Sequence, residues 1–227
     1  DYYFIGDLQI YYFSYIFTIF CIIISINSHN FIDGIDGLCS GVFISSIILI
    51  FIYSIYFDAS ANFEFLNDLI FIVFCFFITN YFFNKYKIFL GDSGSNLLGF
   101  YLSVILIFYT QGENKLFHPV LAIWVFTIPV FDFFSILLMR IFYLKINPMV
   151  SDKKHIHHLL LYKNIVVKKI TLILIFSNLL LGLFGLIIFK LFGPLMCLII
   201  YILTFLLYFY YSRFVISNSQ KKLFFFL

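Results

Sequence analysis

Seven long apolar stretches constrain the fold of this 227-residue chain more than any other feature. A helix needs about 20 mostly apolar residues to cross the hydrocarbon core of a bilayer, and about 17 at the short end. Only 11% of the residues are charged, against about 25% in soluble domains. The sequence therefore predicts an all-α polytopic membrane protein, with a single transmembrane domain over residues 1–227. Its seven predicted transmembrane helices cover roughly residues 10–27, 41–57, 68–84, 95–110, 119–139, 170–189 and 194–212.

Lysine and arginine side chains fall almost entirely on one side of this predicted bundle. If the chain after Tyr211 is cytoplasmic, that side holds all of the 14 Lys and Arg residues except Lys115 and Lys190. Basic residues in short loops remain on the cytoplasmic side of a membrane. The charge pattern therefore predicts a cytoplasmic loop over residues 140–169, which contains three histidines. It also predicts that the polar junctions between the spans form a site on the cytoplasmic face.

The junction after the first span reads NSHNFIDGIDGL and combines amide and carboxylate side chains with glycines. Asn27, Asn30 and Asp33 recur every three residues, so on a helix they would spread over one side. Gly34 and Gly37 allow a close approach between the backbone and a ligand. Such oxygen-rich groups suit a hard cation, a phosphate or proton transfer. A polar turn with helix caps is the alternative interpretation.

A second polar junction, FLGDSGS at residues 89–95, opens the fourth span. Asp and Ser are natural N-cap residues, so helix capping is one interpretation. The other is that a helix start with small residues offers free N–H groups to a phosphate, with a divalent cation held by Asp92. This junction alone leaves both interpretations open.

The third polar segment, DKKHIHH at residues 152–158, lies in the predicted cytoplasmic loop. Its histidines, His155, His157 and His158, directly follow two lysines. This pattern favours an anionic ligand over a metal cage, which requires tetrahedral spacing of its ligands. A solvated face is the alternative.

The fourth feature is the segment Pro129–Asp132, late in the fifth predicted span. Pro129 can kink the helix and free a backbone carbonyl. Structural pairing of Asp132 with a neighbouring helix is as compatible with the sequence as a catalytic role. All four features fall on the same face of the predicted bundle. Together they are typical of a site for a phosphorylated, cation-bound substrate. A transporter would instead place polar residues near the bilayer midplane, and the sequence shows no such set.

These motifs resemble the polyprenyl-phosphate N-acetylhexosamine-1-phosphate transferase family, and within it the bacterial enzymes that load GlcNAc-1-phosphate onto undecaprenyl phosphate. NSHNFIDGIDGL resembles the family's Asn-rich double Asp-Gly motif, and FLGDSGSNLLGF resembles its Gly-Asp-(Ala/Ser)-Gly-Ser motif. DKKHIHHLL is similar to the histidine motif of the GlcNAc branch. The likeness runs from about residue 10 to residue 212.

The resemblance implies a reaction in which undecaprenyl phosphate attacks the β-phosphorus of a UDP-N-acetylhexosamine and UMP leaves. This step would initiate a cell-envelope polysaccharide such as lipopolysaccharide at a bacterial inner membrane. Mg²⁺ or Mn²⁺ is the implied cofactor, because phosphoryl transfer depends on positioning and charge neutralisation. The implied partners are the UDP-sugar, the polyprenyl phosphate lipid and the membrane, with no nucleic acid. A homodimer remains open.

The family's motifs also imply roles for individual residues. Asp92 would be a metal ligand with Asn30 beside it, and Asp33 and Asp36 would be the catalytic residues. Asp132 falls in the family's Pro-x-x-Asp position, for which no role is implied. The implied substrate-binding residues are Asn27, Asn30, Gly34, Phe89 (against uracil), His155, His157 and His158.

The chain departs from the family pattern in two ways. The family has an aspartate pair in an earlier cytoplasmic loop, and no Asp-Asp occurs in this sequence. Family members also have several spans before the first motif, whereas one is predicted here. We therefore expect residues 1–227 to be the C-terminal portion of a longer family chain and to be inactive alone. The alternative is a catalytically incomplete or structural membrane subunit that retains the site.

Overall fold

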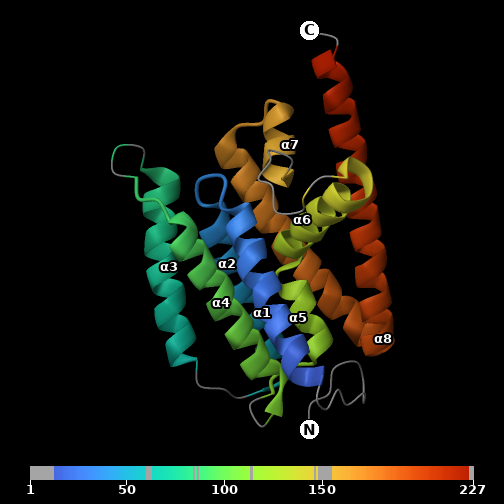
Figure 1. Cartoon of the computed structure of the whole chain (residues 1–227). Helices are drawn as coiled ribbons and strands as arrows, with labels where there is room; N and C mark the ends of the chain where they lie inside the picture. The colour runs from blue at the N-terminus through green and yellow to red at the C-terminus, as the bar shows by residue number, and fades with distance from the viewer. Residues whose placement is uncertain are drawn as a thin grey trace.

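The computed structural model describes residues 13–59, 63–83, 85, 87–112, 115–145, 147 and 155–224, and all regular structure in this part of the chain is helical (Figure 1). Six of its helices are long and apolar enough to cross a bilayer. The predicted all-α membrane fold is therefore confirmed. The elements are α1 (Phe13–Ile32), α2 (Leu38–Tyr56), α3 (Glu64–Phe82), α4 (Gly91–Thr110), α5 (Pro119–Val125), α6 (Thr127–Leu138), the π-helix η2 (Met139–Leu144), α7 (Ile156–Tyr162) and α8 (Val167–Phe224).

The predicted sixth and seventh spans form one element, α8, which reverses its direction at Gly193. Gly193 has a φ of 76°, a conformation that favours glycine, and Pro194 follows it. In Figure 1 the orange half of α8 runs away from α7 and the red half returns. The helix α8 therefore supplies two passes. Together with α1, α2, α3, α4 and the α5–α6 pair, it gives the seven passes that the sequence predicts.

The predicted fifth span, residues 119–139, is broken into α5 and α6 at Phe126, which has φ −129° and ψ 46°. Pro129 has no N–H and cannot bond to the carbonyl oxygen of Val125, four residues earlier. This oxygen instead accepts hydrogen bonds from Ser46 Oγ at 3.0 Å and from Asn178 Nδ2 at 2.9 Å. The kink expected at Pro129 is therefore confirmed.

Asn178 of α8 closes the break in the fifth span. Its side chain is fully buried. Its Nδ2 also donates to Ser45 Oγ at 3.0 Å, and its Oδ1 accepts from the backbone N–H of Ile128 at 3.3 Å. Polar groups deep in a bundle are stable when they are paired in this way. The amide therefore serves the fold, and it is not the polar lining that a transport pathway needs.

The polar junctions lie together at one end of the bundle, which we call the site end. The end of α1, the starts of α2 and α4, the end of α6 and the helix α7 all lie there (Figure 1). A hydrogen bond from Ser25 Oγ to the carbonyl oxygen of Gly99, at 2.7 Å, joins α1 to α4 within the bundle. The predicted loop over residues 140–169 contains the helix α7 instead of being irregular throughout. Asp152, Lys153 and Lys154 lie outside the described residues.

Candidate active site

A cavity of about 250 Å³ opens at the site end, between the turn after α1 and the start of α4. We call it the polar cavity. It joins the double Asp-Gly motif to the FLGDSGS motif, although the whole of α2 and α3 separates the two in the sequence. The residues that line it are Asp33, Gly34, Ile35, Asp36, Asn80, Phe89, Leu90, Gly91 and Asp92.

Asp92 lies in the first turn of α4, and its carboxylate is held by α1. Asn30 Nδ2 donates to Asp92 Oδ1 at 3.2 Å and to Ser95 Oγ at 3.1 Å. The N-terminus of α4 has Leu90 as its N-cap residue and no hydrogen bond from a capping side chain. Helix capping is therefore not what the Asp92 side chain does here. The first N–H groups of α4 remain available to an anion.

Asp33 follows the last residue of α1 and is half-buried at the edge of the polar cavity. Burial raises the pKa of this carboxyl group, and the negative charge of Asp92 raises it further, to about 6. Asp92 lines the same cavity, and repulsion by its negative charge disfavours the ionised form of Asp33. A divalent cation between them would relieve that repulsion.

The oxygen donors around Asp92 fit the way in which proteins usually hold Mg²⁺. Among the described residues no cluster of three His, Cys, Asp or Glu side chains is arranged for a metal ion. Mg²⁺, however, is commonly held by one or two carboxylates together with substrate phosphates and water. Asp92, with Asp33 nearby, meets this requirement. Asn30 presents its amide nitrogen to Asp92, so its Oδ1 would reach an ion only after the amide rotates.

Asp36 also lines the polar cavity and forms an ion pair with Lys87. The Lys87 ammonium also lies 5.6 Å from the centre of the Phe89 ring, which is 74% exposed. Thr171 Oγ1 of α8 donates to the backbone carbonyl of Asp36 at 2.8 Å. Sequence reasoning missed Lys87. The only indication in the sequence was that Lys87 is basic and stands two positions before Phe89.

Asn80, near the end of α3, connects the two loops that form the polar cavity. Its Oδ1 accepts a hydrogen bond from the backbone N–H of Gly37, and its Nδ2 donates to the carbonyl oxygen of Ile88 at 2.7 Å. The side chain is buried, so both groups need these partners. Sequence reasoning also missed Asn80, whose signal was an amide at the end of an apolar span.

The three predicted histidines lie beside the polar cavity. His157 is buried against Gly34, and a side chain on Gly34 would collide with its Nε2. The rings of His157 and His155 are nearly parallel, with centroids 5.7 Å apart. The centroids of the His157 and His158 rings are 4.3 Å apart. The pKa of His157 is lowered to about 4, chiefly by burial; Asp132 opposes this shift, and the neighbouring histidines add to it. His157 is therefore neutral near pH 7.

The ring nitrogens of His157 have no hydrogen-bond partner within the described part of the protein. A neutral imidazole offers one donor and one acceptor. Asn27, in contrast, is not among the residues that line the polar cavity. Its Nδ2 donates to the carbonyl oxygen of Ile23 in its own helix, at 2.7 Å. The Asn27 amide is therefore used within α1 and does not reach the cavity, whereas Asn30 in the same motif bonds to Asp92.

Comparison with known proteins shows what the part of the chain around this site is similar to. Residues 2–110, which include both sides of the polar cavity, match the model of glycosyl transferase family 4. Over these residues, just under half of the chain, the protein is similar to members of that family. The resemblance seen in the motifs is confirmed.

Several similar proteins are named undecaprenyl-phosphate alpha-N-acetylglucosaminyl 1-phosphate transferase. The protein of Escherichia coli (strain K12) is 33% identical over 160 residues, which cover 66% of this chain and 41% of that protein. The protein of Yersinia pestis is 34% identical over 151 residues, with the same coverage. The protein of Haemophilus influenzae is 36% identical over 94 residues, which cover 41% of this chain and 26% of that protein. The chain therefore spans less than half the length of these relatives.

Proposed function

We propose that this chain carries the active-site region of a membrane transferase that moves N-acetylhexosamine-1-phosphate, in the first place GlcNAc-1-phosphate, from a UDP-sugar to undecaprenyl phosphate. The polar cavity carries the proposal, because it joins two motifs of the family beside three histidines at the end of a membrane bundle. The relatives' name, undecaprenyl-phosphate alpha-N-acetylglucosaminyl 1-phosphate transferase, supports the lipid acceptor and the sugar-1-phosphate group in this proposal. The basic residues of the site end support a cytoplasmic orientation in a bacterial inner membrane.

In the proposed reaction a phosphate oxygen of the lipid forms a bond to the β-phosphorus of the donor. The bond from that phosphorus to the oxygen bridging the two phosphates breaks, and UMP leaves with this oxygen. Asp92 and Asn30 would hold Mg²⁺, which neutralises charge on the diphosphate when it is bound. The N-terminus of α4 would add backbone N–H donors.

The remaining groups of the site would orient the reactants. Asp33, with its pKa of about 6, is ionised near pH 7 and can accept the proton of the lipid phosphate. The exposed ring of Phe89 offers a flat apolar face to uracil. The neutral ring of His157 offers a donor and an acceptor to the sugar or the diphosphate.

The proposal is tested with a panel of donors. The protein encoded by the complete reading frame is incubated with undecaprenyl phosphate, Mg²⁺ and UDP-GlcNAc, UDP-GalNAc or UDP-glucose, and UMP is measured. We expect release of UMP with N-acetylhexosamine donors, and only when the lipid is present. Absence of release with all three donors would favour the alternative of a subunit that retains the site without turnover. The 227-residue chain, assayed in parallel, is expected to be inactive.

A further inference from the structure

The buried carboxylate of Asp132, in α6, accepts three hydrogen bonds. His155 Nδ1 lies 2.8 Å from its Oδ2, the backbone N–H of Ile156 donates to its Oδ1 at 2.8 Å, and the Tyr208 hydroxyl donates to Oδ1 at 3.2 Å. Asp132 is only 2% exposed. Burying a carboxylate is costly unless it is well hydrogen-bonded, so these three donors hold it in a defined orientation.

These hydrogen bonds connect three helices. Ile156 is the first residue of α7, and His155 is its N-cap residue. Asp132 therefore caps the N-terminus of α7 from a different helix, where a negative charge is favoured. Tyr208 belongs to the second half of α8, and a hydrogen bond of 2.8 Å between Ser135 Oγ and Ser212 Oγ joins α6 to α8 about one turn further on. The start of α7 is thus held by α6, which is itself joined to α8.

The contacts continue from His155 to the polar cavity. The ring of His155 meets the edge of Phe31 in α1, with centroids 5.1 Å apart, and stacks on His157. His157 in turn packs on Gly34, which lines the polar cavity. A movement of His155 would therefore displace the histidine that borders the cavity.

We propose that Asp132, supported by Tyr208, is a positioning residue that fixes the orientation and the tautomer of His155. A histidine that donates from Nδ1 to a carboxylate keeps Nε2, on the other side of the ring, as the atom that can meet a ligand. Asp132, His155 and Tyr208 all lie outside the residues that the family model matches. The consequence for catalysis rests on the proposed function, whereas the tautomer does not.

Nitrogen-15 NMR of the histidine rings tests the tautomer in the complete protein, with His155→Gln to identify the signal. We expect the His155 proton on Nδ1 in the unsubstituted protein. In Asp132→Asn the carboxamide nitrogen replaces Oδ2, so the proton should move to Nε2. Asp58→Asn, at an exposed carboxylate of the opposite end, serves as the matched control and should leave the spectrum unchanged. An unprotonated Nδ1 in the unsubstituted protein would overturn the proposal, whatever the variants do.

Transfer assays measure the consequence for catalysis. The orienting partner of a functional histidine is typically worth about 10- to 100-fold, so Asp132→Asn should lower kcat by that factor, with a smaller effect on KM. Tyr208→Phe, which removes one of the three donors, should lower kcat about fivefold. An unchanged kcat in both variants would contradict the role in catalysis. If the protein transfers no sugar phosphate at all, the proposed function fails while the NMR result still decides the role of Asp132.

Discussion

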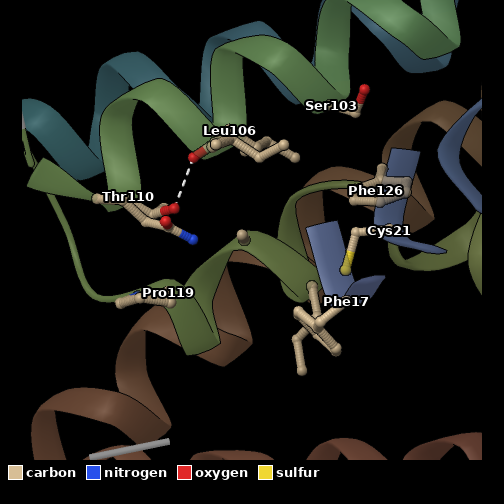
Figure 2. Close-up of a pocket in the computed structure, with 11 residues that line it drawn as sticks. Phe17, Cys21, Ser103, Leu106, Thr110, Pro119 and Phe126 are labelled. Carbon is tan, nitrogen blue, oxygen red and sulfur yellow. Dashed lines mark hydrogen bonds between the residues drawn. The ribbon is translucent and has the colours of Figure 1, made fainter. Parts of the chain in front are cut away.

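Two cavities lie at opposite ends of the bundle, and they differ in chemistry. The polar cavity, where α1 ends and α4 begins, is bordered by three aspartates. At the other end, α1, α4 and α5 enclose a smaller cavity of about 120 Å³, here called the apolar cavity (Figure 2). Its lining includes Phe17, Cys21, Leu106, Pro119 and Phe126.

The polar atoms of the two cavities are used differently. In the apolar cavity Thr110 Oγ1 donates to the carbonyl oxygen of Leu106 at 2.6 Å, as Figure 2 shows, and Ser103 Oγ donates to that of Phe100 at 2.7 Å. Both hydroxyl groups therefore bond to carbonyl oxygens of their own helix. In the polar cavity the acidic groups of Asp33 and Asp92 instead repel each other. The aspartates are therefore gathered at the polar cavity, whereas the apolar cavity offers a ligand mainly dispersion contacts.

Asp92→Ala should lower transfer more than the other changes, and it tests the difference between the two cavities. Removing the proposed metal ligand is expected to lower transfer about 10³-fold or more and to abolish its dependence on Mg²⁺, because charge neutralisation carries most of the catalysis. The matched control is Ser103→Ala in the apolar cavity, which should leave transfer unchanged. Activities of the two variants that fall equally would contradict the division of roles between the cavities.

Protonation of Asp33 at low pH should have an intermediate effect on transfer. Its raised pKa means that the carboxyl group is protonated below about pH 6 and ionised above it. If Asp33 acts as a base, transfer should fall about tenfold per pH unit below this value. Infrared spectroscopy of the carboxyl band, with Asp33→Asn as reference, measures the titration directly. Asp92→Asn or added Mg²⁺ should each lower the midpoint, and a midpoint that neither changes would show that the groups do not interact.

Lys87→Met should have the smallest of the three effects. Loss of the ammonium leaves the charge of Asp36 uncompensated beside an anionic donor, so KM for the UDP-sugar should rise about fivefold, as for a partly exposed ion pair. Lys190→Met is a matched control at the opposite end, where the ammonium lies 5.5 Å from the centre of the Tyr56 ring. An equal rise in both variants would show that general charge, and not the Lys87–Asp36 pair, matters.

The sequence predicted the passes of the fold well because each depends on local hydropathy. It also predicted that Asp33, Asp36 and Asp92 would meet, because topology brings alternate junctions to one face. The breaks inside spans were harder to predict. Pro129 signalled the kink, but the repair of its missing hydrogen bond by Asn178 depends on a contact between distant helices.

The residues that sequence reasoning missed share one physical property, because each acts through a contact that spacing cannot reveal. Asn80 joins two loops, Lys87 pairs with a residue of another junction, and Tyr208 reaches Asp132 from α8. Asn27 shows the converse. It has the right spacing for the motif, but its amide bonds to its own helix.

The most direct test of the central claim follows the donor's β-phosphate. UDP-GlcNAc carrying radioactive phosphorus at this position and tritium in the sugar is given to the complete protein with undecaprenyl phosphate and Mg²⁺. If the polar cavity carries out sugar-1-phosphate transfer, both labels should enter the lipid in equal amounts while unlabelled UMP is released. Tritium in the lipid with the phosphorus label retained in UDP would instead show plain glycosyl transfer and would contradict the account.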